Sequence, residues 1–306
     1  MRRYFLLGTT ASGKTPVGLQ LAPLLNAEIL SLDSMLLYRG MDIGTAKPTL
    51  AERAQVPHHL IDLVGPNETY SAARWVDAAR AVESELSMRG KAALYVGVTA
   101  LYLKALLHGL PQDRRPPEGL SASLSREWEA EGGPASLRAE LERVDPQAAE
   151  RIHWNDVRRL LRALEHWRAF GEPWSAAAAP WPKSGALSEP AVALHWPRAT
   201  LHARILRRFE QMMEDGFLEE VRRLNANPGF GATARLAIGY RELLAHLEDG
   251  LNLDTAVAHA VRATKVLVRR QATWLRSFPD LQELECSGET DLGEVARAAA
   301  RLLGAG

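Results

Sequence analysis

The chain has 306 residues, with 37 basic and 37 acidic side chains and no formal net charge, which excludes a uniformly basic protein that coats nucleic acid. Its 46% hydrophobic and 24% charged residues match an ordinary globular protein. The single cysteine, Cys286, excludes an intramolecular disulfide scaffold and a cysteine-based metal cluster. Because we find neither a signal peptide nor an apolar stretch of about 18 residues, we expect a soluble, cytoplasmic protein without membrane contact.

The first third of the chain alternates short apolar runs with amphipathic segments. The apolar runs predict strands at residues 4–7, 28–33 and 92–96. Apolar residues at helical spacing predict helices at residues 15–25 and 71–89. Strands that alternate with helices are typical of βαβ units, so we expect an α/β fold with a parallel sheet.

The sequence pattern changes after residue 110. Helices are predicted at residues 120–131, 137–144 and 155–170, and an Ala-, Pro- and Ser-rich loop at 172–190. Residues 191–195 read as a strand that rejoins the sheet, and residues 201–304 as mostly helical. We therefore predict a core of residues 1–112 plus 186–306, interrupted by a helical insertion domain at 113–185.

A phosphate-binding motif follows the first strand. The sequence G-T-T-A-S-G-K-T matches G-x-x-x-x-G-K-[ST], in which glycines let backbone N–H groups surround a phosphate at a helix N-terminus. The lysine supplies a point charge, and the final hydroxyl, Thr15, suits Mg²⁺. The predicted fold is thus a P-loop NTPase-like parallel sheet flanked by helices. The predicted diphosphate-binding residues are Gly8, Thr9, Thr10, Ala11, Ser12, Gly13, Lys14 and Thr15.

One carboxylate, Asp33, ends the second predicted strand. Ligands of parallel sheets bind at the carboxyl ends of the strands, so Asp33 is expected beside the phosphate loop. The residue type alone leaves three roles open: a metal ligand, a general base or a helix cap.

Further motifs give the chain a resemblance to the tRNA dimethylallyltransferases, also called tRNA isopentenyltransferases. They agree in order and spacing from about residue 4 to residue 278. Besides the phosphate loop and the run that follows Asp33, they are Pro57-His-His-Leu-Ile-Asp62, Tyr70-Ser71, Val96-Gly97-Val98-Thr99 with Leu101-Tyr102, Asp145-Pro146, Asn155-Asp156, Arg159, Arg162-Ala-Leu-Glu165, Gly239-Tyr240-Arg241-Glu242 and Arg270-Gln271-Ala-Thr273-Trp274.

The resemblance implies that the phosphate loop serves alkyl transfer. A dimethylallyl group would move from dimethylallyl diphosphate to the exocyclic amine of the adenosine 3′ of the tRNA anticodon, with release of diphosphate and use of Mg²⁺. Asp33 would be the general base, Lys14 a second catalytic residue, and Thr99 a contact to the diphosphate. We expect a monomer that binds the anticodon stem-loop. The tRNA-binding residues implied are Asp33, Ser34, Met35, Leu36, Arg158, Arg159, Leu160, Leu161, Arg162, Leu236, Ala237, Ile238, Gly239, Tyr240, Arg241, Arg269, Arg270, Gln271, Ala272, Thr273, Trp274, Leu275 and Arg276.

Two basic segments fit an RNA partner, residues 151–170 and 257–278. In the first, five arginines outnumber Asp156 and Glu165, and Arg158 and Arg162 share one helical face. Residues 257–278 carry five Lys and Arg residues and no acid, and four of these cations share one helical face: Arg262, Lys265, Arg269 and Arg276. A solvated helix face is the alternative interpretation of each segment. Trp274 could stack on a base or pack in the core, and packing is the commoner role. His58 and His59 are expected to bond backbone groups in a loop and not to bind zinc.

Other functions share the phosphate loop. A small-molecule kinase would need no basic C-terminal helices, and a non-catalytic NTP-binding switch would need no carboxylate at position 33. A variant enzyme could alkylate free adenine nucleotides, but the long basic C-terminal region argues against it.

Two positions depart from the family pattern. Thr9 stands where the family usually has proline, and Val98 where it usually has the second of two glycines. Because the preceding residues are strand-like, we expect Val98 to keep a negative φ and Thr99 to keep its role.

Overall fold

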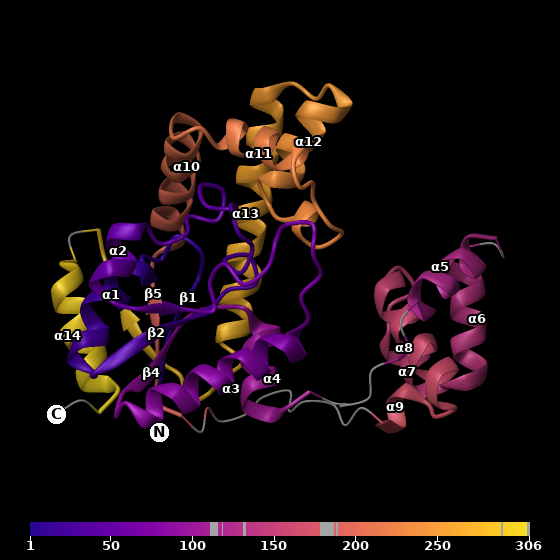
Figure 1. The fold of residues 1–306 in the computed structure, drawn as a ribbon, viewed down its shortest axis with the longest axis horizontal. Helices are drawn as coiled ribbons and strands as arrows, with labels where there is room; N and C mark the ends of the chain where they lie inside the picture. Colours follow the sequence, from indigo (N-terminus) through magenta and orange to yellow (C-terminus); the bar gives the residue numbers. More distant parts are fainter. Residues whose placement is uncertain are drawn as a thin grey trace. The chain divides into compact units, whose positions relative to one another are not determined.

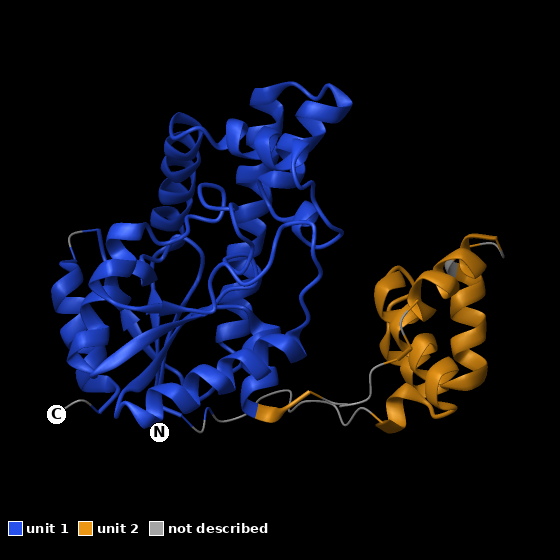
Figure 2. Cartoon of the chain, in the orientation of Figure 1, with its two compact units in different colours: residues 1–107, 184–306 blue, residues 108–183 orange. Residues whose placement is uncertain are grey.

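The computed structural model describes residues 1–110, 116–117, 119–130, 133–177, 187, 189–288 and 290–304. They form two compact units (Figure 2): residues 1–107 with 184–306, and residues 108–183. The sequence predicts the insertion at 113–185, whose two edges fall partly outside the described residues. Among the described helices, none is both long and apolar enough to cross a membrane.

The larger unit is built on a six-stranded, fully parallel sheet (Figure 1). Its strand order is β3-β2-β4-β1-β5-β6, so β1 lies between β4 and β5 in the middle. The strands are β1 (Arg3–Gly8), β2 (Ala27–Leu32), β3 (His58–His59), β4 (Ala92–Gly97), β5 (Ala191–His195) and β6 (Gln282–Glu285). The side chains of β2 are buried along its whole length, those of Glu28 and Ser31 included, because a parallel sheet is covered on both faces.

Helices cover the sheet. The helix α1 follows the phosphate loop and packs against α14, the last helix of the chain. The helices around the sheet are α1 (Lys14–Leu24), α2 (Leu50–Gln55), α3 (Ala72–Met88), α4 (Ala100–His108) and α14 (Leu292–Leu302).

A second group of helices lies between β5 and β6 in the sequence. The long helix α13 packs against α10 and α12 and reaches β1, so it connects this helical group with the sheet (Figure 1). The group comprises α10 (Arg198–Glu214), α11 (Phe217–Ala226), the 3₁₀ turn η1 (Ala234–Leu236), α12 (Tyr240–Asp249) and α13 (Leu253–Leu275).

The smaller unit is helical. Its core gathers aliphatic side chains of α6, α7 and α8, among them Leu141 and Leu160, which are fully buried. The carboxylate of Asp145 accepts a bond from the Ala148 N–H at 3.0 Å and two from Ser175, which ties α7 to α9. The helices are α5 (Leu120–Ala130), α6 (Pro134–Val144), α7 (Pro146–Arg151), α8 (Val157–Phe170) and α9 (Trp174–Ala177).

The structure corrects the expectation for His58 and His59, and it adds a short element to each of two predicted segments. His58 and His59 form the short strand β3 and not a loop. The His58 ring bonds the Val56 carbonyl at 2.7 Å as expected, but the His59 ring bonds the buried carboxylate of Glu28 at 2.7 Å. In addition, β6 lies inside the segment predicted to be mostly helical, and α9 lies inside the predicted loop at 172–190, most of which falls outside the described residues.

Candidate active site

The phosphate loop wraps the end of β1 before α1 begins. Ala11 and Gly13 have φ angles of 65° and 79°, and Gly13 caps the N-terminus of α1. The Ser12 N–H donates to the Thr9 carbonyl at 3.2 Å, which closes the loop on itself. Such alternating conformations turn successive N–H groups toward one point and form an anion-binding concavity at a helix N-terminus.

Lys14 lies across this loop. Its Nζ donates to the Thr9 carbonyl at 2.7 Å and to Ser12 Oγ at 3.5 Å. Burial lowers the pKa of Lys14 to about 8; the charge of Asp33 opposes the shift and that of Arg208 adds to it. Lys14 therefore lies within electrostatic range of one carboxylate and one guanidinium, and it binds a proton less tightly than an exposed lysine does.

Asp33 and Thr99 meet at neighbouring strand ends. Asp33 follows β2, and its Oδ1 accepts a hydrogen bond from the Met35 N–H at 2.8 Å. Thr99 follows β4, and its Oγ1 accepts one from the Ser34 N–H at 3.1 Å. Asp33 thus fixes its own turn with one carboxylate oxygen, and the Thr99 hydroxyl contacts the residue next to it.

The turn after β4 explains how Val98 replaces a glycine. The backbone of Val98 has no positive φ, as we expected. The demanding position is Gly97, with a φ of 155°, where an added Cβ would lie 2.3 Å from the Leu32 carbonyl oxygen. Because the Val98 and Thr99 N–H groups both donate to that same oxygen, at 3.2 and 3.1 Å, the turn is held without a second glycine.

Arg208 is a site residue that the sequence did not reveal. It lies on α10, its Nη2 donates to the Thr45 carbonyl at 3.2 Å, and burial lowers its pKa against the opposing charge of Asp33. The sequence of α10 contains several arginines, and no motif distinguishes this one. Its position within electrostatic range of Lys14 and Asp33 follows from the packing of α10 against α11 and α13.

Two further side chains hold the phosphate loop from outside. Gln271 of α13 accepts a hydrogen bond from the Thr10 N–H at 2.8 Å through its Oε1. The Trp196 indole donates to the Ser12 carbonyl at 2.9 Å. Gln271 belongs to the predicted RNA-binding segment, whereas Trp196, directly after β5, was not predicted to take part in the site.

Known proteins resemble this chain over nearly its whole length. The IPP transferase family model matches residues 36–278. The tRNA dimethylallyltransferase of Methylibium petroleiphilum is 45% identical over 97% of this chain and 93% of its own length, and that of Thiobacillus denitrificans is 43% identical over 98% and 97%.

The chain belongs to the tRNA dimethylallyltransferase, or IPP transferase, family. Membership confirms the expected resemblance, the P-loop-type α/β fold and the enzyme class, that of a tRNA dimethylallyltransferase. Two solved structures share the fold. The full-length tRNA isopentenylpyrophosphate transferase of Bacillus halodurans has a TM-score of 0.70 and 33% identity, covering 99% of this chain and 96% of its own. A eukaryotic dimethylallyltransferase acting on tRNA has a TM-score of 0.79 and 25% identity, covering 98% and 78%.

In this dimethylallyltransferase the predicted RNA-binding residues differ in exposure. Leu236 is 60% exposed, whereas Tyr240 and Leu160 are fully buried. The Tyr240 hydroxyl donates to Glu220 Oε1 at 2.5 Å, and Leu160 packs in the core of the smaller unit. Trp274 is half-buried against Phe278 with ring centroids 4.9 Å apart, as the packing interpretation expects. The two fully buried residues can act in RNA binding only through their neighbours.

Glu220 anchors the chain that follows Asp33. Its carboxylate accepts the N–H groups of Asp42, Ile43 and Gly44 at 2.9, 2.8 and 3.2 Å, together with the hydroxyl of Tyr240. Four donors converge on one buried carboxylate. This anchor explains the buried Tyr240 of the Gly239-Tyr240-Arg241-Glu242 motif and fixes the chain at Asp42 to Gly44 against α11.

A cavity of about 900 Å³ adjoins the site on the side of α10. Arg204, Arg207 and Arg208 line it from α10, but neither Lys14 nor Asp33 does. Lys47 also lines the cavity; its Nζ is buried and forms ion pairs of 2.6 Å with Asp42 and with Asp62. The cavity therefore offers arginine cations without including the reacting groups.

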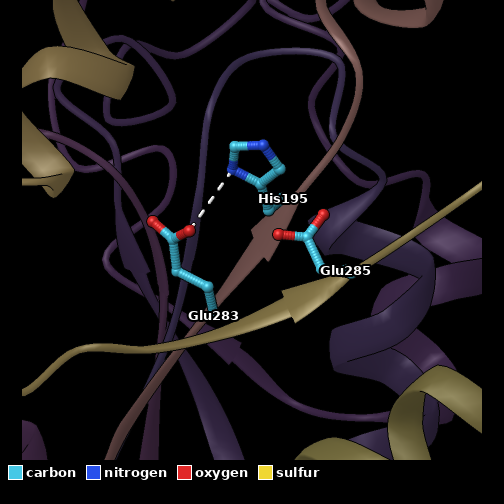
Figure 3. Close-up of side chains that lie close together, drawn as sticks. All are labelled: His195, Glu283 and Glu285. Atoms are coloured by element: carbon cyan, nitrogen blue, oxygen red, sulfur yellow. Dashed lines mark ion pairs between the residues drawn. The ribbon is translucent and has the colours of Figure 1, made fainter.

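A separate cluster lies at the outer edge of the sheet (Figure 3). His195 Nδ1 pairs with a Glu283 carboxylate oxygen at 3.5 Å, and Glu285 lies beside them. One ligand atom from each of the three lies within 4.8 Å of the others, but all three side chains are exposed. Exposed acidic groups of this kind are common without a bound ion, so we assign the cluster no function.

Proposed function

We propose that this enzyme transfers a dimethylallyl group from dimethylallyl diphosphate to the exocyclic amine of the adenosine 3′ of the anticodon, with release of diphosphate. The observation that carries the proposal is the placement of one carboxylate, Asp33, beside Thr99 and within electrostatic range of Lys14 at the end of the phosphate loop. In this arrangement Asp33 would act on the nucleophile, and the phosphate loop would bind the leaving diphosphate.

The cradle acts on the leaving group. As the bond between the allylic carbon and the diphosphate oxygen breaks, negative charge grows on the leaving oxygens. The loop N–H groups, Lys14 and Arg208 stabilise that charge more strongly in the transition state than in the substrate. Arg208 and its neighbours in the adjoining cavity also favour the approach of a diphosphate anion.

Asp33 acts on the nucleophile. A new bond forms between the amine nitrogen and the allylic carbon, and the amine loses one proton, which the Asp33 carboxylate takes up. Oδ1 of Asp33 is held by the Met35 N–H, which orients the second oxygen for this transfer. A positioned carboxylate base contributes about 10²–10⁴ in rate.

Mg²⁺ fits the chemistry of the donors at this site. The Thr15 hydroxyl, at the start of α1, and the Asp33 carboxylate are hard oxygen donors of the type that Mg²⁺ binds. When bound, the ion would neutralise part of the diphosphate charge. Thr9 Oγ1 is buried without a partner in the described structure, so the cradle also holds a hydroxyl that a diphosphate oxygen could satisfy.

The adenosine must leave its stack to reach Asp33, because the carboxylate lies at the end of a buried strand. We therefore infer that the anticodon loop presents a splayed base, as single-stranded RNA does to proteins. Arg158, Arg269 and Arg276 are exposed cations suited to hold the loop, and we propose that a single protomer suffices.

A mass measurement tests the proposal. The protein is mixed with unmodified tRNA, dimethylallyl diphosphate and Mg²⁺, and the RNA is digested for mass analysis. We expect one adenosine to gain one dimethylallyl group. ATP turnover without that gain would favour a kinase, and transfer to free adenine nucleotides but not to tRNA would exclude the RNA substrate.

A further inference from the structure

The indole of Trp196 lies against the phosphate loop. Trp196 follows β5, in which Leu194 pairs with Gly8, so its side chain reaches the loop that begins at Gly8. The side chain is buried, and its Nε1 donates to the Ser12 carbonyl at 2.9 Å. The proposed chemistry leaves Trp196 without a role, although this residue is bonded to the backbone that would hold the diphosphate.

The hydrogen bond to the Ser12 carbonyl also orients a donor. The peptide group that carries this carbonyl carries the Gly13 N–H as well, and in a planar trans peptide the two point in opposite directions. An indole that holds the carbonyl therefore directs the Gly13 N–H away from Trp196. Because hydrogen bonds in series polarise one another, the bond to the carbonyl also makes this N–H a stronger donor.

The Gly13 N–H is available to an anion. The Thr10 N–H already donates to Gln271 at 2.8 Å. The Ser12 N–H already donates to the Thr9 carbonyl at 3.2 Å. In the described part of the chain, the Gly13 N–H has no acceptor. Since Gly13 caps the N-terminus of α1, its N–H lies where the helix dipole favours negative charge.

A guanidinium covers the indole ring. Cζ of Arg204, on α10, lies 3.6 Å from the centre of the Trp196 ring, which is a close cation–π contact. Arg204 is half-buried, and no described carboxylate is close enough to affect its pKa, which burial lowers. A cation over the ring withdraws electron density from the indole, so its N–H becomes a stronger donor.

We propose that Trp196 is a positioning residue of the diphosphate site: its indole, covered by Arg204, holds the Ser12 carbonyl so that the Gly13 N–H donates to a diphosphate oxygen. The inference rests on the proposed function and adds to it a series of contacts from α10 to the phosphate loop. Trp196 acts through the peptide group, so it affects diphosphate affinity and leaves the proton transfer to Asp33 unchanged.

The variant Trp196→Phe tests the indole N–H, because phenylalanine keeps an aromatic ring beside Arg204 but cannot donate. Calorimetry measures the affinity for inorganic diphosphate in the presence of Mg²⁺. We expect this affinity to fall about two- to tenfold, as for the loss of one hydrogen bond. The KM for dimethylallyl diphosphate should rise by the same factor, and the KM for tRNA should stay at the parent value.

The matched control is Trp75→Phe. Trp75 is a fully buried tryptophan of the same unit, but its Nε1 has no acceptor in the described structure. Its replacement therefore removes an indole from the core without removing a hydrogen bond, and diphosphate affinity should stay at the parent value.

The variant Arg204→Gln tests the contact between the guanidinium and the indole. Loss of the cation should lower diphosphate affinity about two- to fivefold in the parent protein. In Trp196→Phe the same change should have little effect, because the N–H that Arg204 strengthens is then absent. The indole N–H resonance of Trp196, one of eight tryptophans, gives a readout in the parent protein itself: it should shift when diphosphate is added.

Parent-like diphosphate affinity in Trp196→Phe would overturn the inference, and so would an equal loss in Trp75→Phe or a Trp196 resonance that diphosphate does not shift. Equal losses from Arg204→Gln in the parent and in Trp196→Phe would mean that Arg204 acts on the anion directly, which would overturn the series of contacts. The proposed function fails separately: the parent protein would then bind no diphosphate and leave the mass of tRNA unchanged.

Discussion

Charged side chains at the end of the sheet are held by neighbouring groups, whereas those on the exposed faces of α8 and α13 face solvent. At the sheet end, each charged group is held by a neighbour: Lys14 by the Thr9 carbonyl, Asp33 by the Met35 N–H. On α13, Arg262, Arg269 and Arg270 point to solvent and have no acidic partner in the described structure. Fixed groups serve a reaction, since they need no rearrangement as charge develops, whereas mobile cations serve affinity, which adds up over many weak contacts.

The substitution Asp33→Asn gives the strongest test that the fixed groups at the sheet end serve the reaction. The amide keeps the size and the bond to the Met35 N–H but cannot take a proton. We expect the single-turnover rate to fall by about 10²–10⁴ while diphosphate affinity stays near that of the parent. An unchanged rate would mean that Asp33 only caps its own turn and is not the general base.

Lys14→Ala should weaken dimethylallyl diphosphate binding and slow transfer together, because its charge acts on both the substrate and the transition state. Loss of a charged hydrogen bond is worth about 1.5–3 kcal/mol, or about 10- to 150-fold. If only RNA affinity fell, the assignment of the cradle would be wrong.

The pH dependence of diphosphate binding gives a second test of Lys14. Its pKa of about 8 means that the unliganded protein loses this charge above pH 8, and the diphosphate favours the charged form. Affinity for inorganic diphosphate should therefore fall above pH 8, by up to about tenfold per pH unit. Lys14→Arg should remove this step because arginine stays charged, and a step that persists in Lys14→Arg would assign it to another group.

Glu220→Ala tests whether the region around the sheet end is held as a unit. Removing the carboxylate leaves the N–H groups of Asp42, Ile43 and Gly44 without their acceptor. We expect the free energy of unfolding to fall by about 1–3 kcal/mol, measured by urea denaturation. Glu219→Ala on the same helix is the control: its carboxylate is exposed and, among the residues that the structure describes, pairs with Arg222 alone, so its effect should stay below about 1 kcal/mol. Equal losses in both variants would contradict the anchor.

The smallest effects are expected on the helix faces. Arg158→Ala and Arg269→Ala should each lower the salt slope of tRNA binding by about 0.7–0.9, with little change in the rate at saturation. Arg159 pairs with Asp156 at 3.4 Å, so Arg159→Ala offers a comparison in which part of the charge is already used. Salt slopes identical to that of the parent would mean that Arg158 and Arg269 lie on solvated helix faces and do not contact RNA phosphates.

The sequence predicted those parts of the molecule in which a local pattern is sufficient. The strands β1, β2, β4 and β5 are apolar runs, and the phosphate loop has a fixed spacing. β6 was missed because its Gln-Glu-Leu-Glu sequence is a mostly exposed edge strand without apolar alternation, and β3 because it has only two residues. Arg208 and Glu220 were missed because their importance arises from distant partners, Asp33 and the N–H groups of Asp42 to Gly44, which no periodicity records.

The hydrogen bond between Gln271 and the Thr10 N–H joins the helix whose cations we propose to bind RNA to the loop that we propose to hold the leaving diphosphate. If occupancy of α13 moves that amide, it alters the free energy of diphosphate binding, and thermodynamic reciprocity requires diphosphate to alter RNA affinity by the same factor. One bond of 2.8 Å can therefore make the two substrates cooperative and bias their order of binding and release.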